Sequence, residues 1–237
     1  MKKSIGRLNF LLLLLTLNAC LGGSRTPPAA GQADGGATKD DAGAVGLCRA
    51  PNPYELIINE YLVRPGGIDV DGDGESNALD EAIELTLPAD ASPVSLVGGE
   101  LWAGLQRHGT IIDGECLRAG SLIVLTAAQA SPLQVHEGTT VIHLDHLLKL
   151  PDAGGHFEFR GRDGTVWAHV TFPKQTTGSA TSFTRVVDGD AATPFVAHAT
   201  LPKANGTLSS FGLCNTGDVA CGCLASQGMD CAPLSEE

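Results

Sequence analysis

Apolar and polar residues alternate with a period of two in several segments of the chain. In residues 80–87 (DEAIELTL), Ile, Leu and Leu alternate with Ala, Glu and Thr. Residues 165–172 (TVWAHVTF) repeat this pattern and place Trp167 and His169 on the more polar face. A period of two is typical of strands that bury one face. Both segments are therefore predicted to be half-buried strands.

Other segments complete the predicted set of strands. The apolar runs 56–63 (LIINEYLV) and 121–127 (SLIVLTA) predict central strands covered on both faces. Residues 157–167 predict a hairpin that turns at Arg-Asp-Gly, and only residues 141–150 (VIHLDHLLKL) have a helical tendency. Further short strands are predicted near residues 94–97, 100–105, 109–112, 183–187 and 195–201. Many short strands separated by Gly and Pro predict an all-β fold, an antiparallel sandwich or barrel.

The N-terminus has the layout of a secretory signal. A basic start (MKK) precedes an apolar run at 8–17, which is too short to span a bilayer. The run ends on Leu-Asn-Ala-Cys, which resembles the lipobox of bacterial lipoproteins. This resemblance implies that residues 1–19 are removed and that Cys20 is lipidated, and Leu21 after it favours the outer membrane or the cell surface. The alternative is an ordinary secretory signal with an incidental cysteine.

A flexible tether is predicted between the lipid and the folded part. Gly, Ala and Pro dominate residues 20–47, which hold no aromatic residue and cannot bury enough surface to fold. Removal of the signal takes away three basic residues and no acidic ones, so the net charge falls from −12 to −15. This charge argues against nucleic acid as a partner, because phosphate binding needs clustered Lys and Arg. Membrane attachment would then depend on the acyl chains.

Six cysteines remain once Cys20 is assigned to lipid. An even number in an oxidising compartment predicts three disulfides, whose pairing the sequence leaves open. The cysteine-rich C-terminal tail, residues 218–237, holds little that could build a core and is expected to depend on its crosslinks. The alternative, a four-cysteine zinc site, lacks the paired CxxC spacing of structural zinc. The predicted disulfide cysteines are Cys48, Cys116, Cys214, Cys221, Cys223 and Cys231.

Several motifs follow one another in a defined order over residues 54–217. The opening motifs are LIINEYLV, the acidic loop DVDGDG, DEAIEL and PVSLVGGEL. The middle and closing motifs are LLKLPDAGGHFEFRGRDGTVWAHVTFP, SFTRVVDGDAATPFVAHATLP and SSFGLCNTG. In order and spacing, these motifs resemble the lamin tail domain (LTD) as it occurs in bacterial exported proteins. The chain departs from the family at Gly99, where an aromatic residue is expected, and at Phe211, which replaces a proline. The resemblance implies an immunoglobulin-like β-sandwich over residues 48–217, a fold that carries many functions.

The strongest local signal is the segment IDVDGDGESNALDEAIEL at 68–85, which holds seven acidic residues and no Lys or Arg. In the 12-residue calcium loop, oxygen ligands at alternate positions surround a hard cation, and Gly74 falls at the required turn position. The predicted ligands are Asp69, Asp71, Asp73, Glu75, Asn77 and Asp80. The last position holds Asp instead of Glu, which predicts weak binding with a Kd of about 10⁻⁴–10⁻³ M. The alternative is a solvated Asp/Gly turn.

Histidines provide a second candidate for metal chemistry. His143, Asp145 and His146 match part of the HxHxDH zinc motif of metallo-β-lactamase-like hydrolases, but Val141 occupies the position of the first histidine. Surface or packing roles are the alternative for these residues.

Two other features are candidates for a structural or binding role. Glu60 lies within an apolar run, so a buried Glu60 must be paired or bound to a cation, and Arg185 is a candidate partner. The sequence leaves two roles open for Glu60, a structural ion pair and a place in a metal site. Trp167 and His169 are candidates for a recognition patch, unless a loop covers Trp167.

These features favour a non-catalytic, surface-anchored lipoprotein. Its lamin-tail-like domain would bind an envelope or extracellular protein or polysaccharide, with calcium ordering the acidic loop. The chain lacks a GxSxG elbow, a P-loop and a dinucleotide-binding fingerprint. The alternative is a metal-dependent hydrolase of the cell envelope that uses the acidic loop and the histidines.

Overall fold

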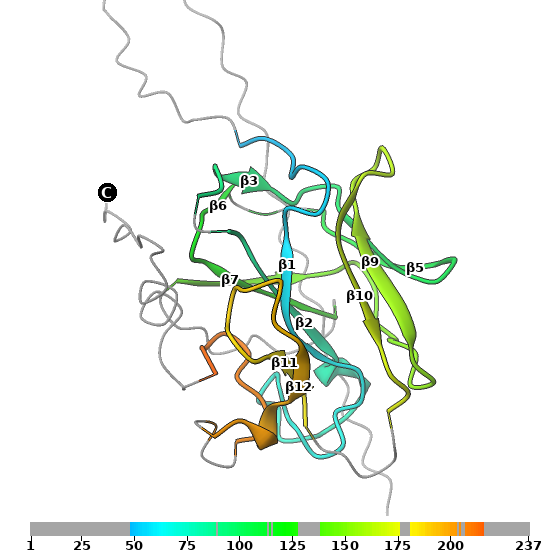
Figure 1. Ribbon diagram of the computed structural model, residues 1–237. Coiled ribbons are helices and arrows are strands. Elements are labelled where there is room, and N and C mark those ends of the chain that lie inside the picture. Colours follow the sequence, from blue (N-terminus) through cyan, green and yellow to red (C-terminus); the bar gives the residue numbers. More distant parts are fainter. Residues whose placement is uncertain are drawn as a thin grey trace, which may run out of the picture. The chain divides into compact units, whose positions relative to one another are not determined.

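A computed structural model describes residues 48–88, 90–112, 114, 116–127, 138–175, 181–202, 204 and 207–215. These residues form twelve strands and two short 3₁₀-helices, but no α-helix (Figure 1). None of the helices among them is long and apolar enough to cross a membrane. The predicted all-β fold is confirmed. The predicted signal, Cys20, the tether and the C-terminal tail lie outside the described residues.

The larger sheet has six strands in the order β12-β11-β1-β2-β7-β8. Their bounds are β1 Ile57–Leu62, β2 Ala82–Thr86, β7 Leu122–Thr126, β8 Thr139–His143, β11 Phe183–Arg185 and β12 Phe195–Ala197. Neighbouring strands are antiparallel except β7 and β8, which run parallel. The register of β1 and β2 sets Glu60 opposite Glu84. Two acidic side chains are thus cross-strand neighbours in the middle of this sheet.

The smaller sheet has four antiparallel strands in the order β10-β9-β4-β5. Their bounds are β4 Glu100–Ala103, β5 Gln106–Thr110, β9 Gly155–Arg160 and β10 Val166–Phe172. The short strands β3 Val94–Ser95 and β6 Cys116–Leu117 pair separately, and the 3₁₀-helices are η1 Ala78–Asp80 and η2 His198–Thr200. The predicted hairpin is confirmed: β9 and β10 meet at a turn in which Gly164 has a φ of 84°.

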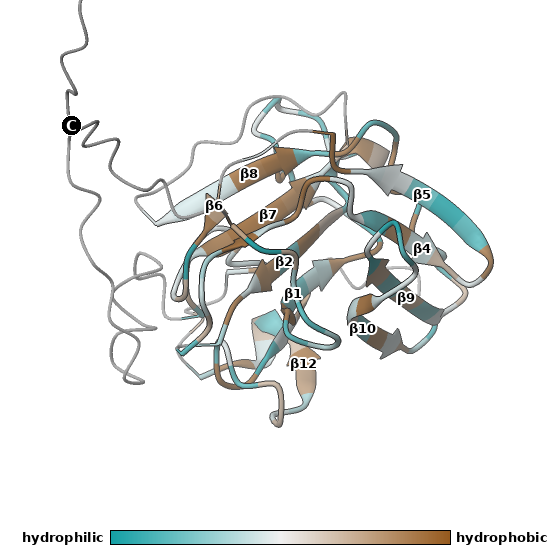
Figure 2. Cartoon of the chain, turned by 90° about the horizontal axis from the view of Figure 1, so that it is seen from above, coloured by the Kyte–Doolittle hydropathy of each residue, from teal (hydrophilic) through white to brown (hydrophobic). Residues whose placement is uncertain are grey.

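The main core lies between the two sheets, which makes the fold a β-sandwich. Buried apolar side chains from both sheets form one cluster. At its centre Tyr61 of β1 contacts four phenylalanine rings, with ring centroids 5.0 to 5.9 Å away. These rings belong to Phe157, Phe172, Phe183 and Phe195. Figure 2 shows that β7 is largely hydrophobic, whereas β5, at an edge of the smaller sheet, is largely hydrophilic.

A second apolar cluster covers the outer face of the six-stranded sheet. It joins side chains of β1, β2 and β7 to the loop after β1, and Phe211 packs against it. Its buried members are Leu62, Ile68, Val70, Ala82 and Val124. The prediction of a half-buried strand at 80–87 is therefore wrong, because β2 is buried at every position. Segments distant in sequence cover the face that carries Glu84.

The predicted helical tendency of residues 141–150 is also wrong. Residues 139–143 form β8, which pairs with β7 in parallel. Beyond His143 the chain is irregular, yet Leu144, Leu148 and Leu150 are buried in the main core. Their spacing looks helical in sequence, but pairing with a neighbouring strand and burial in the core decide the local structure here.

Candidate functional site

The acidic segment lies in the loop between β1 and β2. Ile68 and Val70, with 7% and 8% of their surface exposed, insert into the apolar cluster on the outer face of the sheet. Asp69 lies between them and is exposed, as is Asp73, whereas Asp71 is buried. Burial of the two apolar side chains thus sets the path of the loop and leaves Asp69 toward solvent.

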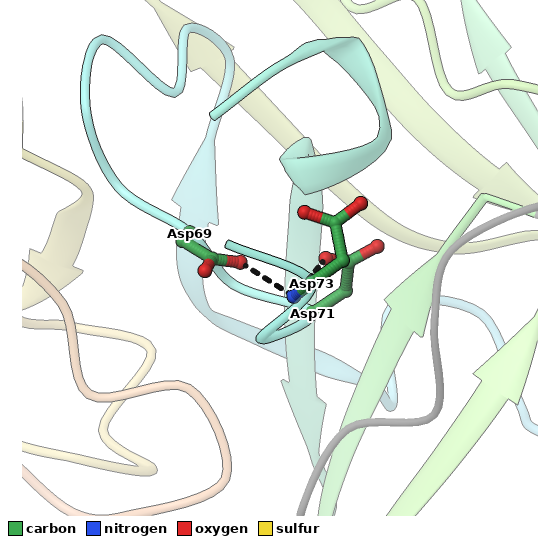
Figure 3. A group of neighbouring side chains, drawn as sticks. All are labelled: Asp69, Asp71 and Asp73. Carbon is green, nitrogen blue, oxygen red and sulfur yellow. Dashed lines mark hydrogen bonds between the residues drawn. The ribbon is translucent and has the colours of Figure 1, made fainter. Parts of the chain in front are cut away.

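The structure brings Asp69, Asp71 and Asp73 together (Figure 3). One carboxylate oxygen from each lies within 4.8 Å of the others. The Asp69 carboxylate accepts the N–H groups of Gly72 at 2.7 Å, Asp73 at 3.2 Å and Gly74 at 2.9 Å. Gly72 and Gly74 have φ values of 71° and 91°, which glycine adopts at little steric cost. The N–H groups of Asp73 and Glu75 donate to the carboxylates of Asp71 at 3.2 Å and of Asp73 at 2.7 Å, so backbone N–H groups hold all three carboxylates in the turn.

The other predicted ligands lie apart from this group. The buried Asp80 carboxylate accepts the N–H groups of Val70 and Asn77, both at 2.7 Å, and so closes the loop. The Asn77 side chain caps η1. Glu75 is exposed and is not one of the clustered carboxylates. The structure thus brings together three of the six predicted ligands and uses Asn77 and Asp80 to shape the loop.

This aspartate group suits a hard cation. Within the described residues, no other His, Cys, Asp or Glu side chains form a group of three or more this close together. Clustered carboxylate oxygens in a tight turn are the donors that calcium prefers. Glu81, just after the loop, instead accepts the Leu150 N–H at 2.8 Å. Burial, reinforced by Asp152, raises the pKa of Glu81 to about 7.

Glu60 is fully buried, as expected for a partnered carboxylate, but Arg185 is not its partner. It accepts hydrogen bonds from the Ser182 hydroxyl, from the Ser210 hydroxyl at 2.6 Å and from the Ser210 N–H at 3.0 Å. The Arg185 guanidinium instead donates to the carbonyl oxygen of Ile58 at 2.9 Å. The predicted pairing with Arg185 is wrong, because serines distant in sequence provide the donors.

The histidine motif does not converge. His143 Nδ1 lies 3.0 Å from the Thr126 hydroxyl, and the Asp145 carboxylate accepts the Thr110 N–H at 2.7 Å. His146 is exposed, with Nδ1 3.6 Å from Asp145. In the described part of the chain these side chains belong to no group close enough to share a metal ion. Local hydrogen bonds occupy His143 and Asp145.

Trp167 is a core residue, so its prediction as a recognition residue is wrong. Only 4% of its surface is exposed, and its ring centroid lies 5.6 Å from that of Phe159. An irregularity in the register between Val166 and Ala168 accompanies this inward placement. A Cβ at Gly99 would lie 2.6 Å from the Trp167 ring, so the indole fills the space that a side chain at Gly99 would need.

An aromatic and charged row lies on the outer face of the four-stranded sheet, and of its members only His169 was predicted from the sequence as a recognition residue. The strand registers align His169, Glu158, Trp102 and Arg107 from β10 to β5. His169 and Arg107 are exposed, whereas Glu158 and Trp102 are half-buried. For Trp102 the sequence signal is the alternation in ELWA at 100–103, where tryptophan takes an outward position. We call these four residues the Trp102 row.

Contacts between side chains order the surroundings of Trp102. The Arg160 guanidinium lies 5.2 Å from the Trp102 ring centroid, and the indole N–H donates to Glu100 at 3.0 Å. Arg107 lies 3.5 Å from Glu100, and Arg160 donates to Glu158. Charged groups thus surround a half-exposed indole on a face formed by strands.

Comparisons with known proteins assign no family to the chain. No model of a protein family matches it, and no curated protein matches it either. The resemblance to the lamin tail domain therefore depends on the sequence motifs and their order.

One of the predicted disulfides is formed by Cys48 and Cys116, with their Cα atoms 5.8 Å apart. Cys214 is buried and also disulfide-bonded, and its partner lies outside the described residues. A cysteine in a disulfide cannot bind zinc as a thiolate, which argues against the four-cysteine zinc site. The remaining predicted cysteines, Cys221, Cys223 and Cys231, lie outside the described residues.

Proposed function

We propose that this protein is an exported lipoprotein, anchored through Cys20 at the outer membrane or cell surface, whose sandwich is a non-catalytic binding module. The observation that carries the binding role is the Trp102 row. The Cys48–Cys116 disulfide supports export, because such bonds persist in oxidising compartments. Mass spectrometry tests the anchor: we expect a chain that begins at a lipid-modified Cys20, and an intact N-terminus on a cytosolic product would contradict it.

We propose that the module is of the lamin tail type. Motifs that carry the resemblance are far apart in sequence but meet in the fold. Glu60 of the opening motif binds Ser210 of the closing motif, and Glu84 accepts the N–H of Gly212 at 2.7 Å. Such contacts between opening and closing motifs support reading them as parts of one domain.

The chemistry around Trp102 favours a neutral polysaccharide as the ligand. Acidic residues are depleted at the centres of protein–protein interfaces, whereas here the indole donates to Glu100 and pairs across strands with Glu158. Planar guanidinium and carboxylate groups can exchange hydrogen bonds with hydroxyls, and the indole offers an apolar surface to sugar C–H groups. The strongly acidic chain would repel an anionic polymer.

Trp102→Ala tests this proposal. We expect the variant to bind neutral polysaccharides such as cellulose or dextran at least about tenfold more weakly than the wild type, because it loses the indole, the largest aromatic surface of the row. Affinity electrophoresis or a pull-down with the insoluble polymer measures this. Leu105→Ala is the matched control, since Leu105 is fully exposed on the same hairpin but lies outside the row.

Equal binding by Trp102→Ala and the wild type would exclude the row as the site. A wild-type protein that binds only the anionic polymer alginate, or no polysaccharide at all, would contradict the choice of ligand.

We also propose that calcium binds the Asp69, Asp71 and Asp73 group and stabilises the domain. With a Kd of about 10⁻⁴–10⁻³ M, about 10 mM calcium should raise the free energy of unfolding by about 1–3 kcal/mol. Replacing Asp69 and Asp73 by Asn should abolish this gain, while both side chains are exposed and the fold should persist. Thermal unfolding in EGTA and in calcium measures the effect.

Asp90→Asn is the control for the calcium experiment, because Asp90 is an exposed carboxylate outside the loop. It should keep the full response to calcium. If the wild type shows no response, or if the double variant responds as the wild type does, the loop is a solvated turn instead.

A further inference from the structure

Residues 207–215, which we call the strap, lie across the outer face of the six-stranded sheet. On one side the carbonyl of Leu208 accepts the N–H of Ser182, next to β11, at 2.9 Å. On the other side the carbonyl of Gly212 accepts the hydroxyl of Thr139, the first residue of β8, at 2.7 Å. Phe211, between them, packs against the outer apolar cluster. The strap therefore reaches across several strands and covers their outer face.

Three N–H groups of the strap donate to three different buried carboxylates. The bonds run from Ser210 to Glu60 at 3.0 Å, from Gly212 to Glu84 at 2.7 Å and from Asn215 to Asp188 at 2.9 Å. Buried backbone N–H groups need partners, and a segment that crosses strands cannot take all of them from the ladder of one strand. Carboxylates from β1, β2 and the turn after β11 fill this role.

Within the part of the chain that the structure describes, no Lys or Arg forms an ion pair with these carboxylates. Glu60 and Glu84 are cross-strand neighbours, and the Asn59 amide donates to Glu84 at 2.7 Å and to Asp188 at 3.0 Å. Among the described residues, the base that acts on Glu60 and Asp188 is His198, which is fully buried. The Nδ1 atom of His198 lies 3.2 Å from the Thr207 carbonyl, whereas Nε2 has no hydrogen-bond partner among the described residues.

Two other charged groups near this face, Arg185 and Asp80, bind elsewhere. Arg185 of β11 donates to the carbonyl oxygens of Ile58 and Ala191, each at 2.9 Å, and to that of Thr193. Asp80, in the loop packed on the same face, accepts N–H groups of its own loop. Neither neutralises the carboxylates beneath the strap.

Burial of these carboxylates makes the closure of the strap depend on pH. Burial raises the pKa of Glu60 and of Asp188, and burial together with repulsion from Glu60 raises that of Glu84 well above its usual range. If the strap lifts, water reaches the carboxylates and their pKa values return toward ordinary ones. The closed state thus binds more protons than the open state, so closure is favoured at low pH and weakens as the pH rises through the raised values.

We propose that the strap is a pH-sensitive latch, closed over the six-stranded sheet in mildly acidic medium and opening locally as the pH rises. Opening uncovers the apolar cluster under Phe211 and breaks the hydrogen bonds from the strap to Glu60, Glu84 and Asp188. The global fold stays intact in this transition, because the main core lies on the other face of the sheet.

Hydrogen exchange of the full-length wild-type protein from about pH 5 to pH 9, corrected for intrinsic rates and recorded in EGTA, tests the latch. The amides of Ser210 and Gly212 should lose protection at least about tenfold more than that of Ile123 in β7. If the ratio of strap to core protection stays constant over this range, the strap is no separate unit and the proposal is wrong.

Glu84→Gln gives a second test, since glutamine keeps the size of the protonated side chain and cannot ionise. We expect it to remove most of the pH dependence of strap protection. Glu81→Gln is the matched control: Glu81 is also buried with a raised pKa, but it binds Leu150 rather than the strap, so this variant should behave as the wild type does. A Glu84→Gln protein that keeps the wild-type pH profile would overturn the proposal, and if it does not fold, the wild-type profile decides alone.

Discussion

Replacing Cys48 and Cys116 together by alanine is expected to lower the free energy of unfolding by about 4 kcal/mol. Their disulfide joins residues 68 positions apart, so its loss greatly increases the conformational freedom of the unfolded chain. Cys48 is half-buried and Cys116 is exposed, so alanine leaves no large cavity. Urea unfolding under non-reducing conditions measures the effect.

The single variants are the controls for this experiment. Cys48→Ala and Cys116→Ala each break the same bond and should lose about as much stability as the double variant. Without the disulfide, two contacts still hold the start of the domain. These are the ion pair between Arg49 and Glu55 and the isolated β-bridge between the backbones of Arg49 and Val94. A double variant within about 1 kcal/mol of the wild type would mean that these contacts suffice and that the crosslink adds little.

Trp167→Ala is expected to cost about 4 kcal/mol of stability. The indole is buried between the sheets and packs against Phe159, with Gly99 and Gly161 leaving room for it. Those glycines cannot fill the space that alanine would leave, so a large cavity should remain. Thermal or urea unfolding measures the loss.

Trp102→Ala is the matched control for Trp167→Ala, because the same residue type lies half-exposed on the outer face of the same sheet. It should change stability by less than about 1 kcal/mol. Similar losses for the two variants would contradict the assignment of Trp167 to the core and Trp102 to the surface.

Local patterns predicted most strands correctly, because the period of two that is typical of a strand depends only on consecutive residues. The apolar runs at 56–63 and 121–127 became β1 and β7, and the hairpin at Arg-Asp-Gly joins β9 to β10. The errors have a common physical cause. The pattern at 80–87 could not reveal that the loop after β1 and the strap cover the second face of β2. The spacing of leucines at 141–150 could not reveal pairing with β7.

Some candidate sites could be predicted from the sequence, whereas others are formed only by the fold. The clustering of Asp69, Asp71 and Asp73 follows from a short turn with glycines between the acids, which is visible in the sequence. Alternation alone placed Trp167 on a surface, and the fold buried it instead. Of the Trp102 row only His169 was predicted from the sequence, because the four members come from four strands and meet only through their registers.

The sequence by itself determined that the chain is a β protein with an acidic turn between its first two strands, because periodicity and turn formation depend on neighbouring residues. Only the tertiary structure decided which faces are covered and which partners the buried groups have. Glu60 shows the reason: its environment comes from Ser182 and Ser210, more than a hundred positions away. Burial and hydrogen bonding between such distant segments depend on how the whole chain packs, which no local pattern records.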